Sequence, residues 1–189
     1  MKREYLERAL DFEGYLAHAD MNVPTMRENF ADTELAPDDD RYFRNLSERL
    51  PAGAISIWGF SESWCGDCVE NVPIVAKMAS LYPVFRLYLF PRDLNLDIMD
   101  ECLGEGFRTI PVFIFYDENG QEIGKFIERP AGAHAFMAKA KKELEHLSPE
   151  EQKRGMYRAR TELRKLYKAG LRNETVTEIR RIIEDRYGS

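Results

Sequence analysis

Cys65 and Cys68 form a close cysteine pair, with only two residues between them, in the stretch SESWCGDCVENVP. Such a pair can ligate a metal ion, form a structural disulfide or act as a redox-active dithiol. A disulfide that closes so small a ring restricts the unfolded chain too little to stabilise a fold. Zinc needs about four ligands, and the third cysteine, Cys102, and the three histidines offer no second pair at the usual spacing. The residues therefore favour a dithiol, with zinc as the weaker alternative. We expect no metal and no cofactor other than a redox-active disulfide between the pair.

The dithiol stands where an apolar, strand-like segment (residues 54–60) gives way to a helical pattern that begins near Gly66. Backbone N–H groups at a helix N-terminus are unpaired, and the helix dipole favours an anion there. This environment lowers the pKa of a thiol such as Cys65 and makes thiolate available at neutral pH. Cys68 follows one helical turn later on the same face, at a spacing that suits a disulfide.

The elements that must position this pair are indicated by hydrophobic periodicity. Strands are expected at 54–60, 84–90, 112–116 and 121–127, and helices at about 66–81, 94–103 and 131–147. Asn119-Gly120, between the last two strands, is typical of a hairpin turn in which both residues take a positive φ. The order β-α-β-α-β-β-α predicts an α/β fold with a central mixed four-stranded sheet. The last of these helices is expected to cover the sheet.

Helical patterns also precede and follow this central unit. Apolar residues recur at helical spacing before residue 51. Ser148 and Glu151 have the spacing of a capping box at the start of another helix. We therefore divide the chain into an N-terminal helical extension, a central domain and a C-terminal helical extension that packs on the core: 1–51, 52–147 and 148–189.

The stretch Trp64-Cys65-Gly66-Asp67-Cys68 between strand and helix resembles the active-site motif of the thioredoxin superfamily. Pro73, five residues after the second cysteine, matches the proline that kinks the active-site helix in thioredoxins. Ile110-Pro111, just before the third strand, matches the family's Ile-Pro, whose proline is cis and faces the dithiol. The chain is most similar to bacterial thioredoxin-family proteins that carry extra helices. The resemblance implies a thioredoxin-like fold over about residues 52–147.

The resemblance also implies a mechanism and partners. Cys65 would attack a substrate disulfide as thiolate, and Cys68 would resolve the mixed disulfide that results. Trp64 would shield the site and offer an apolar docking surface, while Ile110, before a cis Pro111, would pair through its backbone with an extended substrate segment. The expected function is a thiol–disulfide oxidoreductase that reduces disulfides of proteins or small molecules. A cellular reductant or reductase would then restore the dithiol.

Two positions depart from the family's pattern. Thioredoxins usually carry a buried acid six residues before the first cysteine, where this chain has Gly59, and a proline where it has Asp67. A carboxylate next to a thiolate repels it, so Asp67 should raise the pKa of Cys65 and make the couple more reducing. Asp67 and Glu62 are the nearest candidates for the missing acid. The alternative for Asp67 is an acid that only stabilises the start of the helix.

Charge and hydropathy limit which partners and which cellular location we expect. The net charge of −6 argues against nucleic acid. Residues 153–186 nevertheless carry 11 Lys and Arg against 5 Asp and Glu, a net of +6, which indicates either a solvated face or a surface that docks an acidic partner. The longest apolar run, 111–116, is too short to span a membrane, and the first residues lack the apolar core of a secretory signal. We therefore expect a cytoplasmic protein without membrane partners.

Two functions stay open. The first is the oxidoreductase, favoured by the intact dithiol and Ile110-Pro111. The second is a thioredoxin-fold interaction module, in which the long helical extensions bind a partner and redox turnover is slight or absent. Cys102 falls in an expected helix and is read as a small, partly buried hydrophobic residue.

Overall fold

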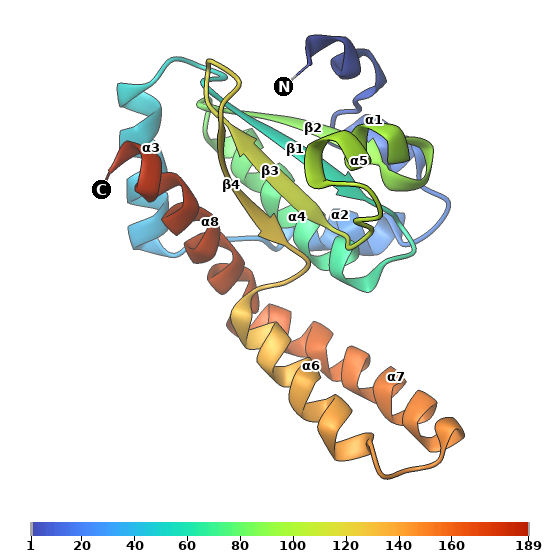
Figure 1. Cartoon of the computed structure of the whole chain (residues 1–189). Coiled ribbons are helices and arrows are strands. Elements are labelled where there is room, and N and C mark those ends of the chain that lie inside the picture. The colour runs from blue at the N-terminus through green and yellow to red at the C-terminus, as the bar shows by residue number, and fades with distance from the viewer. Residues whose placement is uncertain (1, 189) are drawn as a thin grey trace.

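The structure is a computed structural model that describes residues 2–188, built around a four-stranded mixed sheet with the order β2-β1-β3-β4 (Figure 1). The strands are β1 (Ile55–Ser61), β2 (Phe85–Pro91), β3 (Val112–Tyr116) and β4 (Glu122–Ile127). β1 pairs in parallel with β2, and β3 runs antiparallel to both β1 and β4. The two inner strands are buried along almost their whole length, which explains their nearly continuous apolar sequences. The predicted α/β, thioredoxin-like fold is confirmed.

Helices occupy most of the remaining chain. They are α1 (Phe12–His18), α2 (Val23–Ala31), α3 (Pro37–Arg49), α4 (Gly66–Leu81), α5 (Leu96–Leu103), α6 (Ala131–Leu144), α7 (Pro149–Leu166) and α8 (Arg172–Tyr187). Short 3-10 segments lie at Arg3–Arg8 and Arg92–Leu94, and a π-helical turn, Tyr167–Leu171, joins α7 to α8. The crossover helix α4 connects β1 to β2, and its buried face packs on the sheet.

The β3–β4 connection is a hairpin, as the sequence predicts, but its turn is of a different kind. Gly120 takes a positive φ and Asn119 does not. The Asp117 carboxylate instead accepts hydrogen bonds from the backbone N–H groups of Asn119 and Gln121, both at 2.9 Å. This side chain organises a longer loop, so only one residue has to adopt the left-handed conformation.

The N-terminal segment closes one edge of the sheet. Leu10 and Leu89 exchange two backbone hydrogen bonds of 2.8 Å in an antiparallel bridge against the edge strand β2. Further along, α2 packs on α4. Pairing of this kind covers an edge that would otherwise expose free N–H and C=O groups. The extra N-terminal helices are therefore part of the folded body.

The expectation that residues 131–147 cover the sheet is wrong. α6 pairs with α7 in a helical hairpin that projects away from the sheet, and α8 lies against β4 in its place (Figure 1). The reason lies in the side chains: α6 buries only Ala133, whereas α8 buries the larger Val176, Ile179 and Ile183. Larger apolar side chains remove more surface from water, so α8 is the better cover. The unit predicted at 52–147 thus takes its covering helix from the segment assigned to an extension.

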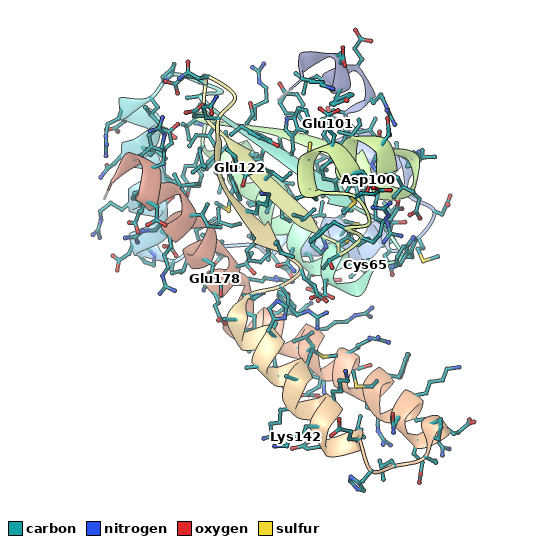
Figure 2. The ribbon with its side chains drawn as sticks, in the orientation of Figure 1. Cys65, Asp100, Glu101, Glu122, Lys142 and Glu178 are labelled. Carbon is teal, nitrogen blue, oxygen red and sulfur yellow. The ribbon has the colours of Figure 1, made fainter. Side chains whose placement is uncertain are left out.

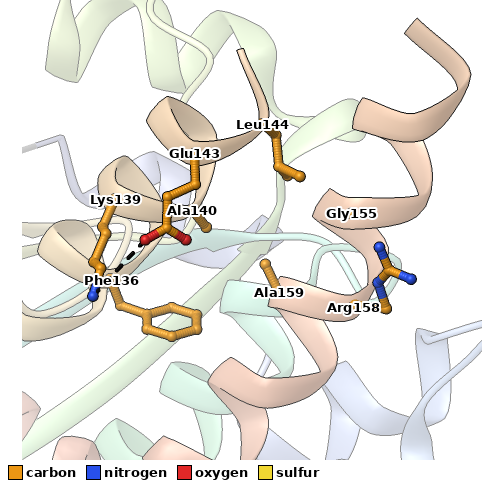
Figure 3. A pocket seen from close by; sticks show the side chains of 8 residues that line it. All are labelled: Phe136, Lys139, Ala140, Glu143, Leu144, Gly155, Arg158 and Ala159. Carbon is orange, nitrogen blue, oxygen red and sulfur yellow. Dashed lines mark ion pairs between the residues drawn. The ribbon is translucent and has the colours of Figure 1, made fainter. Parts of the chain in front are cut away.

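Small residues allow the close helix contacts. A Cβ atom on Gly155 would lie 2.4 Å from Leu144 Cδ2, so a larger residue would push Leu144 aside where α7 crosses α6. Next to this crossing, Phe136, Lys139 and Glu143 of α6 face Arg158 of α7 across a shallow groove (Figure 3). The predicted capping box of Ser148 and Glu151 is present at the start of α7.

The packing of α8 on β4 can be tested at Gly124. A Cβ atom at this position would lie 2.7 Å from Ile182 Cγ2, on a stiff β-branched side chain. We expect Gly124→Ala to lower the free energy of unfolding by about 1–3 kcal/mol, the usual cost of overpacking. Urea denaturation measures this change. In an Ile182→Ala background the same substitution should cost clearly less, and an equal cost in both backgrounds would contradict the contact.

Candidate active site

The structure brings the predicted dithiol and the Ile-Pro loop together. Cys65 is the N-cap residue of α4, and Cys68 lies one turn into the helix, where it is fully buried. Both are free thiols. The thiol of Cys65 donates to the carbonyl oxygen of Ile110 at 3.6 Å, and the Ile110-Pro111 peptide bond is cis. The backbone N–H of Glu62 points to Cys68 Sγ at 3.5 Å.

The two thiols have different acidities. The pKa of Cys65 is lowered to about 7, chiefly by a hydrogen bond with the Cys68 thiol and also by the backbone N–H groups of Cys68 and Asp67. Burial raises the pKa of Cys68 well above its ordinary value, and the neighbouring Cys65 adds to this. At neutral pH a substantial fraction of Cys65 is thiolate while Cys68 keeps its proton. The partly exposed sulfur is therefore the one that ionises near neutral pH, and the buried one stays protonated.

Asp67 lies next to the dithiol, but its carboxylate is paired with another group. Its Oδ2 is 2.8 Å from Nη2 of Arg129, and both side chains are more than four-fifths buried. Burial raises the pKa of Asp67 to about 6 against the opposing charge of Arg129. The charge of Asp67 does raise the pKa of Cys65, the expected direction, but the hydrogen bonds to Cys65 outweigh it. The net shift of Cys65 is downward.

Arg129 is a site residue that the sequence did not reveal. It is the second residue after β4, and it also pairs with the carboxylate of Glu128, its neighbour in the chain. Nothing in its spacing relative to Cys65 marks it, since more than sixty residues separate the two. The contact depends on the hairpin of β3 and β4 returning the chain to the N-terminal end of α4, which only the fold shows.

Tyr15 of α1 is a second such residue. The hydroxyl of Ser61, the last residue of β1, donates to the oxygen of Tyr15 at 2.6 Å, and both side chains are buried. Burial raises the pKa of Tyr15, and the nearby Cys68 and Cys65 add to the shift. The N-terminal extension thus places a neutral hydroxyl close to Cys68.

Packing explains why the usual buried acid is absent. A Cβ atom on Gly59 would lie 2.8 Å from both Leu89 Cδ2 and Phe113 Cε1, so no side chain fits there without repacking. Gly66 is different: a Cβ atom would have no neighbour within 4 Å, and the space around it does not require glycine. Pro73 lies inside α4, where it removes one backbone N–H from the helix.

Trp64 is placed as expected for an accessible face beside the dithiol. Half of its surface is exposed, and the guanidinium of Arg92 lies 5.0 Å from its ring centre. Trp64 also lines a small depression with Tyr15, His18 and Met21. Cys102, by contrast, lies on α5 and packs partly buried against the core, with a pKa raised mainly by burial.

A buried polar cluster fixes the first turns of α4 to the C-terminal helices. The side-chain amide of Asn71 donates to the Tyr167 oxygen at 2.9 Å, and the Thr175 hydroxyl donates to Asn71 Oδ1 at 2.9 Å. On the neighbouring side Asn29 of α2 donates to Glu70 at 3.2 Å. These contacts hold the helix that carries both cysteines from two directions.

Two other features, a metal site and a membrane-spanning helix, were considered for the same residues. Within residues 2–188, no group of three or more His, Cys, Asp or Glu side chains is placed to hold a metal ion. In the same part of the chain, no helix is both long and apolar enough to cross a membrane.

A thioredoxin-like sheet, a helix that begins at a CxxC pair and a facing cis-proline loop define a thioredoxin-fold protein with a dithiol. The thioredoxin family model matches residues 9–142, and the chain belongs to this family. Thioredoxin H4-2 of Oryza sativa subsp. japonica is 30% identical over 126 residues, which cover 67% of this chain and 80% of that protein.

Two solved structures share the fold over nearly the whole chain. A Pseudomonas aeruginosa protein of unknown function matches with a TM-score of 0.70 at 18% identity, covering 98% of both chains. An HIV epitope-scaffold matches with a TM-score of 0.67 at 16% identity, covering 96% of both. The additional helices therefore occur together with this sheet in other proteins.

The influence of Asp67 on the pKa of Cys65 can be measured by alkylation. In a Cys102→Ser background, the rate of reaction with iodoacetamide should follow the ionisation of Cys65, with a midpoint near the pKa of about 7. Asp67→Asn removes the charge that raises this pKa, so the midpoint should fall and alkylation below neutral pH should quicken about twofold. The matched control is Asp38→Asn, at an exposed acid on α3. A midpoint that stays in place or rises would contradict the electrostatic role of Asp67.

Proposed function

We propose that this chain is a thiol–disulfide oxidoreductase that works as a reductase, with Cys65 as nucleophile and Cys68 as resolving thiol. Thioredoxin-like redox chemistry agrees with its family. The observation that carries the assignment is the contrast between the two thiols: Cys65 is partly exposed with a pKa lowered to about 7, while Cys68 is fully buried with its pKa raised. A pair of this kind has one sulfur ready to attack and one that stays protonated until it is needed.

The proposed reaction has two exchanges. The Cys65 thiolate attacks one sulfur of a substrate disulfide, forms a mixed disulfide and releases the other substrate sulfur, which takes up a proton. Cys68 then loses its proton and attacks the Cys65 sulfur, so the second substrate thiol leaves and the pair is oxidised. Two electrons pass to the substrate, and a cellular reductant or reductase returns them to the pair.

We propose that Asp67 is the base that accepts the proton when Cys68 attacks the mixed disulfide. Its negative charge raises the pKa of both thiols, so it lies within electrostatic reach of each. With a pKa raised to about 6 by burial, it is a stronger base than an ordinary aspartate. Trp64 and the backbone of Ile110 would border the bound substrate. The proposed setting is the cytoplasm, where a reducing environment maintains free dithiols.

A second candidate function is an interaction module with little redox turnover. It is favoured by the helical hairpin of α6 and α7, which projects from the body and buries only Ala133 and Leu163 in the core (Figure 1). Both functions can reside in one chain, but only the oxidoreductase requires the acidity difference between the thiols.

Reduction of insulin separates the two candidates. We expect wild type to reduce insulin disulfides in the presence of dithiothreitol. Cys65→Ser should do so at least about a hundredfold more slowly, because the nucleophile is lost. Cys102→Ser is the matched control and should retain full activity, since Cys102 lies on α5 outside the site. Equal, negligible rates in wild type and Cys65→Ser would favour the interaction module.

A further inference from the structure

The helical hairpin of α6 and α7 differs in charge from the rest of the molecule. Residues 131–166 carry 9 Lys and Arg against 5 Glu, a net of +4, while the whole chain has −6 and the remainder therefore −10. Within the described residues, the ion pairs inside the hairpin join Lys139 to Glu143 and Lys165 to Glu162. Most of the hairpin's positive charge is thus left facing solvent.

Part of this charge is ordered into a stripe on α7. Lys153, Tyr157, Arg160 and Arg164 follow one another at steps of four, three and four residues, so they lie along one side of the helix. All four are exposed, and Tyr157 is 72% exposed, a large value for an aromatic side chain. We call these four residues the α7 stripe. At 1.5 Å per residue it is about 16 Å long.

One end of the α7 stripe lies close to the active-site helix. The hairpin starts two residues after Arg129, which contacts Asp67, and is followed directly by Tyr167, which contacts Asn71. In Figure 1, α7 lies on the side of the hairpin nearer the N-terminal end of α4. Burial raises the pKa of Asp67, and Arg160 is among the charges that oppose this shift; Arg164 does the same for Glu70. Both arginines are therefore within electrostatic reach of residues that flank Cys68.

We propose that the α7 stripe docks an acidic segment of a disulfide-bearing polypeptide and so presents that polypeptide's disulfide to Cys65. The inference rests on the oxidoreductase function proposed above and names its substrate class. A stripe of about 16 Å matches about five residues of extended chain, at about 3.3 Å each. Tyr157 offers an apolar contact between the positive charges, as in many interfaces.

The charge distribution favours a peptide over other polyanions. Nucleic acid and anionic membrane surfaces extend well beyond one helix face, and they would meet the net charge of −10 on the rest of the chain. A short acidic segment needs to contact the α7 stripe alone. Opposite charges at such a site mainly speed encounter and select partners.

The test uses two synthetic peptides that each carry one cysteine capped as a mixed disulfide with 2-mercaptoethanol. Their flanking segments differ only in having Asp and Glu or Asn and Gln. We expect pre-reduced wild type to react about tenfold faster with the acidic peptide at low salt, and the preference to shrink as salt screens exposed charges. Arg160→Gln/Arg164→Gln should lose most of this preference. The ratio of the two rates is the readout, so a change in the chemistry of Cys65 itself cancels.

Lys141→Gln/Lys142→Gln is the matched control. It removes the same charge from exposed residues near the far end of α6, and Figure 2 shows Lys142 distant from Cys65. This variant should keep the preference for the acidic peptide. Equal rates with both peptides in wild type, or an equal loss of preference in both double variants, would overturn the docking role of the α7 stripe.

Binding without chemistry separates this inference from the proposed function. Fluorescence anisotropy of a labelled, cysteine-free acidic peptide should show binding that Arg160→Gln/Arg164→Gln weakens, even if neither capped peptide is reduced. In that outcome the oxidoreductase would fail and docking would stand. Tighter binding of single-stranded RNA or of phosphatidylserine vesicles than of the peptide, lost in the same variant, would overturn the peptide as the partner.

Discussion

The first two turns of α4 carry three polar side chains that lie inside the protein, and each must find a partner there. Asp67 is paired with Arg129, Glu70 accepts from Asn29, and Asn71 joins Tyr167 and Thr175. Buried polar groups without partners would cost several kcal/mol in total. The partners come from α2, from Arg129 two residues after β4, and from the C-terminal helices. The helix that holds the dithiol can therefore keep this sequence only because the added helices cover it.

This dependence connects the extensions to the chemistry of the site. Arg129 offsets part of the Asp67 charge that acts on Cys65, and Tyr15 brings a hydroxyl near both thiols. Burial places the pKa of Asp67 at about 6 and that of Glu70 at about 7, so both acids titrate near neutrality. A small movement of the covering helices would therefore shift the pKa values of Asp67 and Glu70 and leave the sheet unchanged.

The fold and the centre of the site could be predicted from sequence because their signals are local. Alternating and continuous apolar runs predict the strands, and the CxxC pair at a strand–helix boundary identifies the dithiol on α4. Arg129 and Tyr15 escaped prediction because they reach the site only through tertiary packing. The sequence predicts the wrong covering helix for a related reason. Chain order suggests α6, the helix that follows β4, whereas packing favours α8, whose buried apolar side chains are larger.

The space available around each position explains why the acid near the dithiol stands at position 67 and not at position 59. At Gly59 the strand lies so close to Leu89 and Phe113 that a Cβ atom would overlap both. An acid for this site must therefore come from another element, and position 67 on α4 offers space beside Arg129. A fully charged, unpaired carboxylate there would oppose the thiolate that the helix N-terminus favours. Pairing with Arg129 spreads that charge, so the chain can hold a carboxylate next to Cys68 while the pKa of Cys65 still falls to about 7.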